Sequence, residues 1–551
     1  MRHDHSLDPS KDSRMSRLSR RMLIAGAGSA AAGLATGVVA APAAAHDPGE
    51  LPPGLTTITP TDPRYPDTQL RGYNKRFVGT PEAVRIVGST EHVVQAVREA
   101  VRGGKRIGVR SGGHGLDGLV DDPAVKIVID FTEMRDIAFD PVRNAFTIEP
   151  GATLGQIYRT LYYGWGVTIP GGVCPAVGAG GHFVGGGVGP LSRQYGLVAD
   201  LVVAVEVVTV DASGVVRAIV ATDNPADPNY DLWWAHTGGG GGNFGVVTKF
   251  WLRQPGVRST NPTQLLPKAP GGYLVGRAIW NWSDMTADAF RRLCANFGAW
   301  HEQNSAAGSA GAALYASMIA PRIESGKILI SGQVDPSVPS QVTLLDSFLA
   351  ALGVGVGPAP LIVKTPVQPW LQPTVSAPDT AVSMGILGPP RSKTKGGLLK
   401  KRYTDEQIDI AYHHLTRADY AHKASVFTIA SYGGRINALA PNATATAHRR
   451  SIMLGSVFSC WDVPADDQRH LDWNRSFFRD LYASTGGVPA PSDANEGCYI
   501  NWPDVDLVDP AHNSSGVGAL ELYYGANLPR LRRVKAKYDP CGVFQHTLSI
   551  R

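Results

Sequence analysis

Residues 171–196 read GGVCPAVGAGGHFVGGGVGPLSRQYG, and this stretch carries the strongest signal in the chain. Ten of its 26 residues are glycine, which lets a backbone turn sharply and lets other groups come close to it. The stretch also holds Cys174, one of only five cysteines among 551 residues. The pattern predicts a tight loop that presents a thiol to something bound against it.

A second glycine turn lies upstream, in VRSGGHGLDG at residues 109–118. It follows the strand-like run KRIGVR, and successive glycines there expose backbone N–H groups that form a concave site suited to a pyrophosphate. An isolated Gly-Gly pair is more often a plain turn, and on the residues alone that alternative stays open. The turn carries His114, so the two loops offer two nucleophilic side chains, His114 and Cys174, to one ligand.

Other ligand classes find less support. The run HTGGGGGNFG at residues 236–245 lacks the Lys and Ser/Thr of a P-loop, and we interpret it as a wall for close approach. No G-x-G-x-x-G unit with a following acidic residue indicates a Rossmann site. His114, Cys174 and His182 are conceivable metal ligands, but no carboxylate lies at a helpful spacing and the glycines suit a flat organic ligand better. We therefore expect no metal.

The composition is that of a soluble globular protein with two domains: 43% of residues are apolar and 18% are charged. The net charge of +5 arises largely in the first 45 residues, so the remainder is too weakly basic to indicate a nucleic-acid partner. The five cysteines show no zinc spacing. One or two disulfides are possible, and the odd number leaves at least one thiol for another purpose.

The first 45 residues have the layout of a twin-arginine export signal. Arg20 and Arg21 precede a charge-free, Ala/Gly-rich stretch that ends in APAAA near Ala45. The alternative is an uncleaved membrane anchor, which the modest hydrophobicity disfavours. We expect a secreted, extracytoplasmic bacterial protein without stable membrane insertion after signal cleavage.

Beyond the leader, the chain alternates strand-like and helical patterns and predicts two α+β domains. The first spans about 75–257 and includes a helix in EHVVQAVREAVRGG that ends at Gly103. The second spans 258–500. A basic cluster within it is expected to be a solvated loop; its members are Arg391, Lys393, Lys395, Lys400, Lys401 and Arg402.

Four segments together resemble the berberine-bridge-enzyme-like flavoproteins of the vanillyl-alcohol-oxidase superfamily. They are RSGGHGLDG, GGVCPAVGAGGHFVGGGVGPLSRQYGLVAD, LWWAHTGGGGGNFGVVTKF and YYGANLPRLRRVKAKYDPCGVFQHTLSI, in the family's order, and the resemblance covers essentially the whole chain after the leader. The resemblance implies an α+β fold with a two-part FAD-binding domain at 75–257. It also implies a substrate domain at 258–500 whose antiparallel sheet covers the flavin, and a C-terminal segment, 501–551, that returns to the FAD domain.

The resemblance further implies FAD bound through two covalent bonds, one from His114 to the flavin 8α-methyl and one from Cys174 to C6. Imidazole nitrogen and thiolate are suited to such additions. The positions implied to surround the pyrophosphate are Arg110, Ser111, Gly112, Gly113 and Gly115. Those implied to line FAD elsewhere are Gly181, His182, Val247, Tyr524 and Asn527.

Two tyrosines match catalytic positions of the family. Tyr499, in GCYINWPD, corresponds to the proposed substrate base, and Tyr432, in SYGGRIN, to a second active-site tyrosine. For each, simple packing in a strand is the alternative. A free phenol has a pKa of about 10, so a basic role requires nearby positive charge or hydrogen bonds.

The resemblance implies an oxidase that removes a hydroxyl proton and passes a hydride to flavin N5, with O2 reduced to H2O2. The substrate is expected to be a sugar or a glycosylated natural product. Val177, a small residue three positions after Cys174, favours reaction with O2, whereas Val188 replaces a family aromatic in GGGVG and makes a tyrosine-assisted second oxidation doubtful. The alternatives are a dehydrogenase using another acceptor and a non-catalytic flavin-binding protein.

Overall fold

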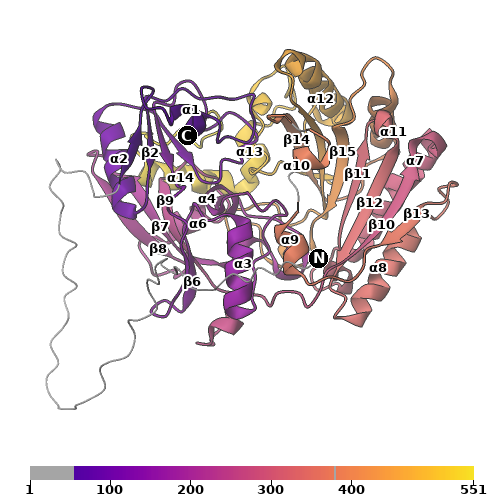
Figure 1. Cartoon of the computed structure of the whole chain (residues 1–551), viewed down its shortest axis with the longest axis horizontal. Coiled ribbons are helices and arrows are strands. Elements are labelled where there is room, and N and C mark those ends of the chain that lie inside the picture. The colour runs from indigo at the N-terminus through magenta and orange to yellow at the C-terminus, as the bar shows by residue number, and fades with distance from the viewer. Residues whose placement is uncertain (1–54, 378–379, 387) are drawn as a thin grey trace, which may run out of the picture. The chain divides into compact units, whose positions relative to one another are not determined.

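The computed structural model describes residues 55–377, 380–386 and 388–551, and Leu51–Arg551 forms one compact unit (Figure 1). The export signal predicted at residues 1–45 lies outside the described residues. Among the helices that are described, none has the length and apolar character needed to cross a bilayer.

The first sheet contains four strands in the order β1-β2-β4-β3, and β4 pairs in parallel with both β2 and β3. Helix α2 (Thr90–Arg102) packs its apolar side, including Val93 and Val97, against this sheet. The Ser89 hydroxyl caps its N-terminus and Gly103 ends it, which confirms the helix predicted there. The strands are β1 (Thr56–Ile58), β2 (Ala83–Ile86), β3 (Ile107–Arg110) and β4 (Ile127–Asp130).

The second sheet is antiparallel, with five strands in the order β5-β6-β9-β7-β8. Helix α3 (Leu154–Trp165) begins with a Thr153–Gln156 capping box. Its buried apolar side belongs to the same hydrophobic cluster as apolar residues of this five-stranded sheet. The strands are β5 (Ile137–Asp140), β6 (Ala145–Ile148), β7 (Val202–Val210), β8 (Val216–Thr222) and β9 (Val246–Leu252).

The third sheet has eight antiparallel strands in the order β13-β10-β12-β11-β15-β16-β14-β17. The strands are β10 (Leu274–Asn281), β11 (Tyr315–Pro321), β12 (Lys327–Val334), β13 (Leu361–Lys364), β14 (Arg391–Leu399), β15 (Ser425–Ser431), β16 (Met453–Trp461) and β17 (Asn495–Gly497).

Four helices bury one face of this sheet, in an apolar cluster that includes Met318 and Ile330. They are α7 (Ala287–Asn304), α8 (Pro339–Leu352), α11 (Asp405–Thr416) and α12 (Asp467–Leu481), and Figure 1 shows them along the magenta-to-orange strands. These four helices do not cover the opposite face of the sheet, which contributes residues to the cavity described below. The fold is therefore the α+β arrangement expected from the sequence, with an antiparallel sheet in its second half.

The solvated loop predicted around Arg391–Arg402 is wrong for its first half. Residues 391–399 form β14, between β16 and β17, and Lys393 and Lys395 are each only 2% exposed. Their ammonium groups are neutralised by acidic residues from distant segments, Asp504 among them. Lysines in a strand can be buried when carboxylates from elsewhere in the fold pair with them. The sequence of such a strand lacks the alternation of apolar and polar residues that predicts a strand, so it was mistaken for a surface loop. Lys401 and Arg402 are exposed, as predicted.

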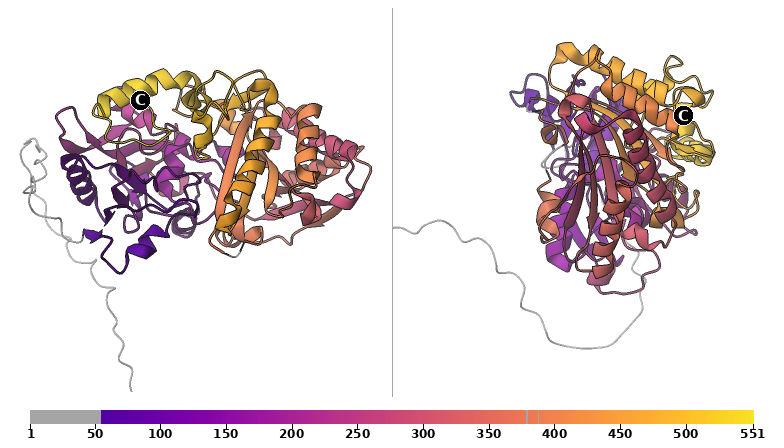
Figure 2. Two further views of the ribbon diagram at one scale, coloured as in Figure 1. Left: turned by 90° about the horizontal axis from the view of Figure 1, so that it is seen from above. Right: turned by 90° about the vertical axis from the view of Figure 1, so that its right-hand side faces the viewer.

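The C-terminal segment packs on the first half of the chain through helices α13 (Ala519–Tyr524) and α14 (Leu528–Tyr538). Leu528 and Leu531 belong to the same buried cluster as Trp234 of α6 (Tyr230–Ala235) and Phe244. In Figures 1 and 2 the yellow segment accordingly lies beside the indigo and purple part of the ribbon. Residues 499–503, just ahead of these helices, thereby reach the cavity described next.

Candidate active site

One cavity of about 520 Å³ collects loops from the first half of the chain, strands of the eight-stranded sheet and the C-terminal segment. That size suits a cofactor or a drug-sized ligand. Most of the residues that the sequence predicted as a site line it. They are Arg110, Ser111, Gly112, Gly113, His114, Gly115, Cys174, Gly181, His182, Val247 and Tyr499, together with Val177 and Val188.

The two glycine loops are close because they pack on each other. A Cβ on Gly112 would lie 2.5 Å from the nitrogen of Gly178, and one on Gly178 would lie 2.2 Å from the nitrogen of Gly112. Side chains at either position would push the loops apart. Part of the glycine content thus serves loop-to-loop contact, and this contact brings His114 and Cys174 to one cavity.

His114 stacks on Tyr73, with ring centroids 4.5 Å apart and planes inclined by 13°. Cys174 is half-buried in the cavity wall. No disulfide joins any two of the five cysteines, all of which the structure describes. The imidazole is therefore held at a fixed angle beside the space that the thiol also faces.

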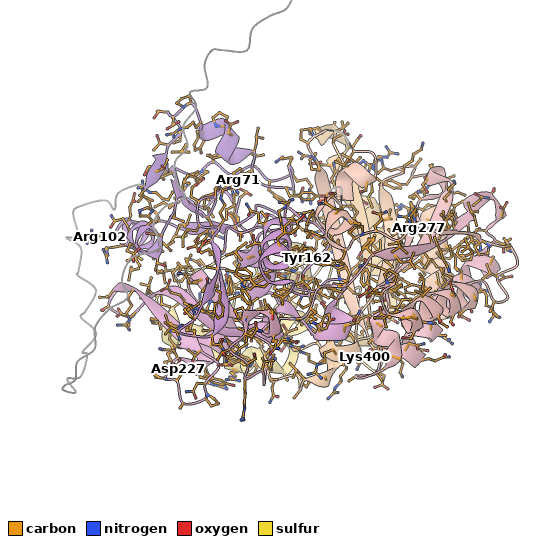
Figure 3. All side chains as sticks on the ribbon, turned by 60° about the horizontal axis from the view of Figure 1, so that its bottom comes forward. Arg71, Arg102, Tyr162, Asp227, Arg277 and Lys400 are labelled. Carbon is orange, nitrogen blue, oxygen red and sulfur yellow. The ribbon has the colours of Figure 1, made fainter. Side chains whose placement is uncertain are left out.

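Arg110 contributes to the wall differently from what the motif implies. Its guanidinium is buried, donates to Asp121 at 2.7 Å and to the carbonyl of Thr68 at 2.5 Å, and faces Asp130. Arg71, labelled in Figure 3, also pairs with Asp130 and donates to the carbonyl of Ser111. Both guanidinium groups are thus bound by carboxylates and backbone carbonyls around the glycine turn. The turn therefore presents mainly its backbone and the His114 side chain to the cavity.

The cavity surface fits a flat, polar-edged cofactor such as FAD. At Gly181 a Cβ would meet nothing within 4 Å, so the bare backbone there faces open space. Gly240, Gly241 and Gly242, from the third glycine run, line the same cavity. Across the described residues, no group of three or more His, Cys, Asp and Glu side chains is arranged to hold a metal ion.

Burial lowers the pKa of three cavity histidines, His182, His236 and His546, which are therefore neutral at pH 7. The pKa of His182 falls to about 4, with a further contribution from His114, and its Nε2 accepts a hydrogen bond from the nitrogen of Gly172 at 3.1 Å. His236 and His546 also line the cavity, each with a pKa of about 4. His236 and His546 lie inside two of the segments quoted above, but neither was predicted as a site residue.

Tyr499 faces the cavity, and its oxygen accepts hydrogen bonds from N–H groups. Asn501 Nδ2 donates to it at 3.0 Å, and the backbone N–H groups of Gly187 and Val188 also act on its pKa. Burial raises the pKa of Tyr499 to about 12, whereas these N–H groups act to lower it. The net shift is upward, so a basic role for Tyr499 stays a prediction.

Tyr432, Tyr524 and Asn527 are not among the cavity-lining residues. The Tyr432 hydroxyl donates to the carbonyl of His448 at 3.2 Å, and burial raises its pKa. Tyr524 donates to the carbonyl of Gly239 at 2.9 Å, and Asn527 donates to backbone carbonyls of residues 441–445. Tyr524 thus supports the glycine run through Gly239, whereas Asn527 holds the 441–445 segment, and a catalytic role for Tyr432 stays a prediction.

The sequence analysis missed the side chains that line the cavity from the eight-stranded sheet and its neighbours. They are Tyr315 of β11, Ala430 and Ser431 of β15, Leu454 of β16, and Asn501 and Trp502. Burial raises the pKa of Tyr315 to about 12, so its phenol is neutral at pH 7. Only Trp502 and Asn501 were accessible to sequence reasoning, because they neighbour Tyr499 in GCYINWPD.

Comparison with known proteins agrees with this geometry. Residues 81–218 match the family model of the FAD binding domain, and residues 498–551 match the model described as berberine and berberine like. The chain is 48% identical over 497 residues to aclacinomycin-N/aclacinomycin-A oxidase of Streptomyces galilaeus, covering 90% of each protein. It is 31% identical over 544 residues to hexose oxidase of Chondrus crispus, covering 92% of this chain and 96% of that enzyme.

Among solved structures, a glycopeptide hexose oxidase in complex with teicoplanin is 47% identical and superimposes with a TM-score of 0.85. The match covers 90% of this chain and 99% of the other. The matched domains, the two nearly full-length relatives and the glycine-walled cavity all lead to one assignment. The chain belongs to the berberine-bridge-enzyme-like family and is an FAD-dependent oxidoreductase.

Proposed function

We propose that the protein is a secreted oxidase that converts a hydroxyl group of a sugar or a glycosylated natural product into a carbonyl, with O2 as the final acceptor. The observation that carries this proposal is the single cavity in which His114, Cys174 and Tyr499 meet. The relatives support the substrate class, since they include an aclacinomycin oxidase and two hexose oxidases, one of them solved with teicoplanin.

The cavity has two kinds of wall, and the proposal gives each a task. Bare glycine backbone on one side suits the flat cofactor. Aromatic and hydroxyl side chains on the other side, Tyr315, Ser431 and Trp502, suit a sugar, which presents both apolar C–H faces and hydroxyl groups. Val188 borders this second region, where an aromatic side chain would leave less room.

We assign His114 and Cys174 as the residues that hold FAD covalently, at the 8α-methyl and at C6. His114 is oriented by its stacking on Tyr73, and Cys174 lies in the loop that packs on the His114 turn through Gly178 and Gly112. Two attachments from two loops would fix the ring against rotation and raise its redox potential.

FAD, held by His114 and Cys174, would supply the redox chemistry: a hydride acceptor for the carbinol carbon and the reduction of O2 to H2O2. Tyr499 takes the hydroxyl proton at its phenolate oxygen, so that C–H cleavage leaves a neutral carbonyl product. Val177 lines the cavity beside the thiol loop, where a small side chain leaves O2 a path. The cavity residues place hydroxyl and base together, which is where most of the rate should arise.

The export route follows from residues 1–45, whose paired Arg20 and Arg21 precede a charge-free stretch. Twin-arginine export moves folded proteins and so suits a chain that binds its cofactor before export. N-terminal sequencing of protein recovered from the culture medium tests this. A mature N-terminus near His46 is expected, and full-length protein retained in the cytoplasm would contradict export.

The activity is tested by adding sugars and glycosides to the purified yellow protein without oxygen. An active hydroxyl substrate should bleach the flavin, and air should restore the colour with H2O2 formed in equal amount. Bleaching that air does not reverse would indicate a dehydrogenase with another acceptor. Failure of every hydroxyl compound to bleach the flavin would indicate a binding protein.

A further inference from the structure

We propose that the GGGV segment at residues 185–188 and Asn501 together form a donor pocket that stabilises the phenolate of Tyr499. The proposal deepens the proposed function and rests on its assignment of Tyr499 as the base. It concerns positioning residues: none of them is required to touch substrate, and each acts through the Tyr499 oxygen.

The backbone side of this pocket is made by consecutive residues. Gly186 and Gly187 have φ values of +111° and +71°, which side-chain-bearing residues rarely adopt. A left-handed residue turns successive N–H groups toward one point, the arrangement in which backbone binds anions. Here the N–H groups of Gly187 and Val188 converge on the Tyr499 oxygen.

Asn501 supplies the third donor. Its Nδ2 donates to the carbonyl of His182 at 2.9 Å and to Tyr499 at 3.0 Å, so both amide hydrogens are used and the amide orientation is fixed. The side chain fits because residue 185 is glycine: a Cβ there would lie 2.0 Å from Asn501 Oδ1. Three glycines in a row thus have distinct tasks, one admitting Asn501 and two shaping the backbone turn.

The groups that lower the Tyr499 pKa are all N–H groups: the Asn501 amide at 3.0 Å and the backbone of Gly187 and Val188. They match an ionised oxygen, which accepts more and stronger hydrogen bonds. Tyr432, in the same apolar cluster as Tyr499, provides the contrast. Its hydroxyl donates to a carbonyl, an arrangement that favours the neutral form.

Other titratable groups surround Tyr499 without replacing this pocket. Tyr432 lies beside the buried Arg449–Asp200 ion pair and near Glu496. His182 on α4 (Ala179–Val184) is neutral at pH 7, and Tyr315 of β11 and the C-terminal His546 also line the cavity. Burial and the three hydrogen bonds are the causes of the shift in the Tyr499 pKa.

The test removes the Asn501 donor and follows the pH dependence of flavin bleaching in the holoenzyme. The rate of flavin bleaching should rise with pH as Tyr499 ionises. In Asn501→Leu this rising limb should lie about one to two units higher in pH, as expected for losing one hydrogen bond to a charged oxygen. Bleaching at pH 7 should slow by about 10- to 100-fold while KM stays near its wild-type value. Asn501→Asp keeps the shape, removes the donor and should move the limb in the same direction.

Asn296→Leu is the matched control, because Asn296 Nδ2 also makes two hydrogen bonds, to the carbonyls of Leu352 and Val354, but is not among the cavity-lining residues. It should leave the limb unmoved. An unmoved limb in both Asn501 variants, with Tyr499→Phe inactive, would overturn the donor pocket and leave the base assignment standing.

A second readout does not depend on activity. The ultraviolet difference between wild type and Tyr499→Phe across pH isolates the ionisation of this one tyrosine. Its midpoint should rise in the Asn501→Leu background by the same one to two pH units. An unchanged midpoint would overturn the inference even if Tyr499 proved not to be the base.

Discussion

Gly112 and Gly178 are in backbone contact, and this contact joins the loop that carries His114 to the loop that carries Cys174. The relationship explains why the sequence is so rich in glycine at both places. The loops must approach each other before either can approach a cofactor. A methyl group at either position would enter space that the partner backbone already fills.

Gly178→Ala should therefore lower stability by about 1–3 kcal/mol and reduce the flavin content of the purified protein, because an overpacked contact must shift backbone. Thermal unfolding and the ratio of flavin to protein absorbance measure both effects. Gly164→Ala is the control, since its Cβ would meet nothing within 4 Å in helix α3. It should be neutral or stabilising by up to about 1 kcal/mol. Equal behaviour of the two variants would contradict the packing argument.

Covalent attachment is tested by denaturing the protein with acid. The wild type and each single variant, His114→Ala or Cys174→Ala, should keep flavin in the pellet through the remaining bond, whereas the double variant should release it. Cys541→Ser, at an exposed cysteine, should behave as wild type. A yellow supernatant from the wild type would exclude both bonds.

The buried charge cluster of Lys393, Lys395, Asp117, Asp504 and Asp506 should be a major contributor to stability. Lys393 Nζ lies 2.7 Å from Asp504, 3.3 Å from Asp117 and 3.3 Å from Asp506. Lys393→Met leaves buried carboxylates without their partner and should cost about 3–5 kcal/mol of unfolding free energy. Lys401→Met, at an exposed lysine, should change it by less than about 0.5 kcal/mol.

The same cluster predicts the sign of the acid response. Against the effect of burial, the Lys393 and Lys395 ammonium groups hold the pKa of Asp504 below its usual value, and the Arg475 guanidinium together with both ammonium groups does so for Asp506. Carboxyl groups with a depressed pKa stabilise the fold above their unfolded value of about 4, and this contribution is lost as pH falls through the folded pKa. Melting temperature should drop steeply below about pH 4 in the wild type. A melting temperature that stayed level to pH 2 would contradict this role.

Val188 contributes its backbone N–H to Tyr499 and its side chain to the cavity wall. Val188→Phe should therefore raise KM for bulky glycosides by about tenfold through lost space, while the pH limb of flavin bleaching stays in place. Steady-state kinetics with a free hexose and a large glycoside separate the effects. A moved limb with unchanged KM would mean that the side chain, and not the backbone, matters to the base.

The sequence was most informative where local chemistry decides structure. Helix α2 follows from its valine spacing and Ser89 cap, and the two loops follow from their glycines. It was least informative where partners come from far along the chain. Lys393 is buried because Asp504 lies beside it, and 111 residues separate them. Asn501 can be found beside Tyr499 in the sequence, but its fit against Gly185 cannot, because these two residues meet only in space.

The central claim is that Tyr499 removes a hydroxyl proton while flavin is reduced, and rapid mixing without oxygen tests it most directly. With a substrate that bleaches the wild type, Tyr499→Phe should slow flavin reduction by about 10²- to 10⁴-fold while the flavin spectrum and its attachment stay normal. A rate of flavin reduction equal to that of the wild type would contradict the claim.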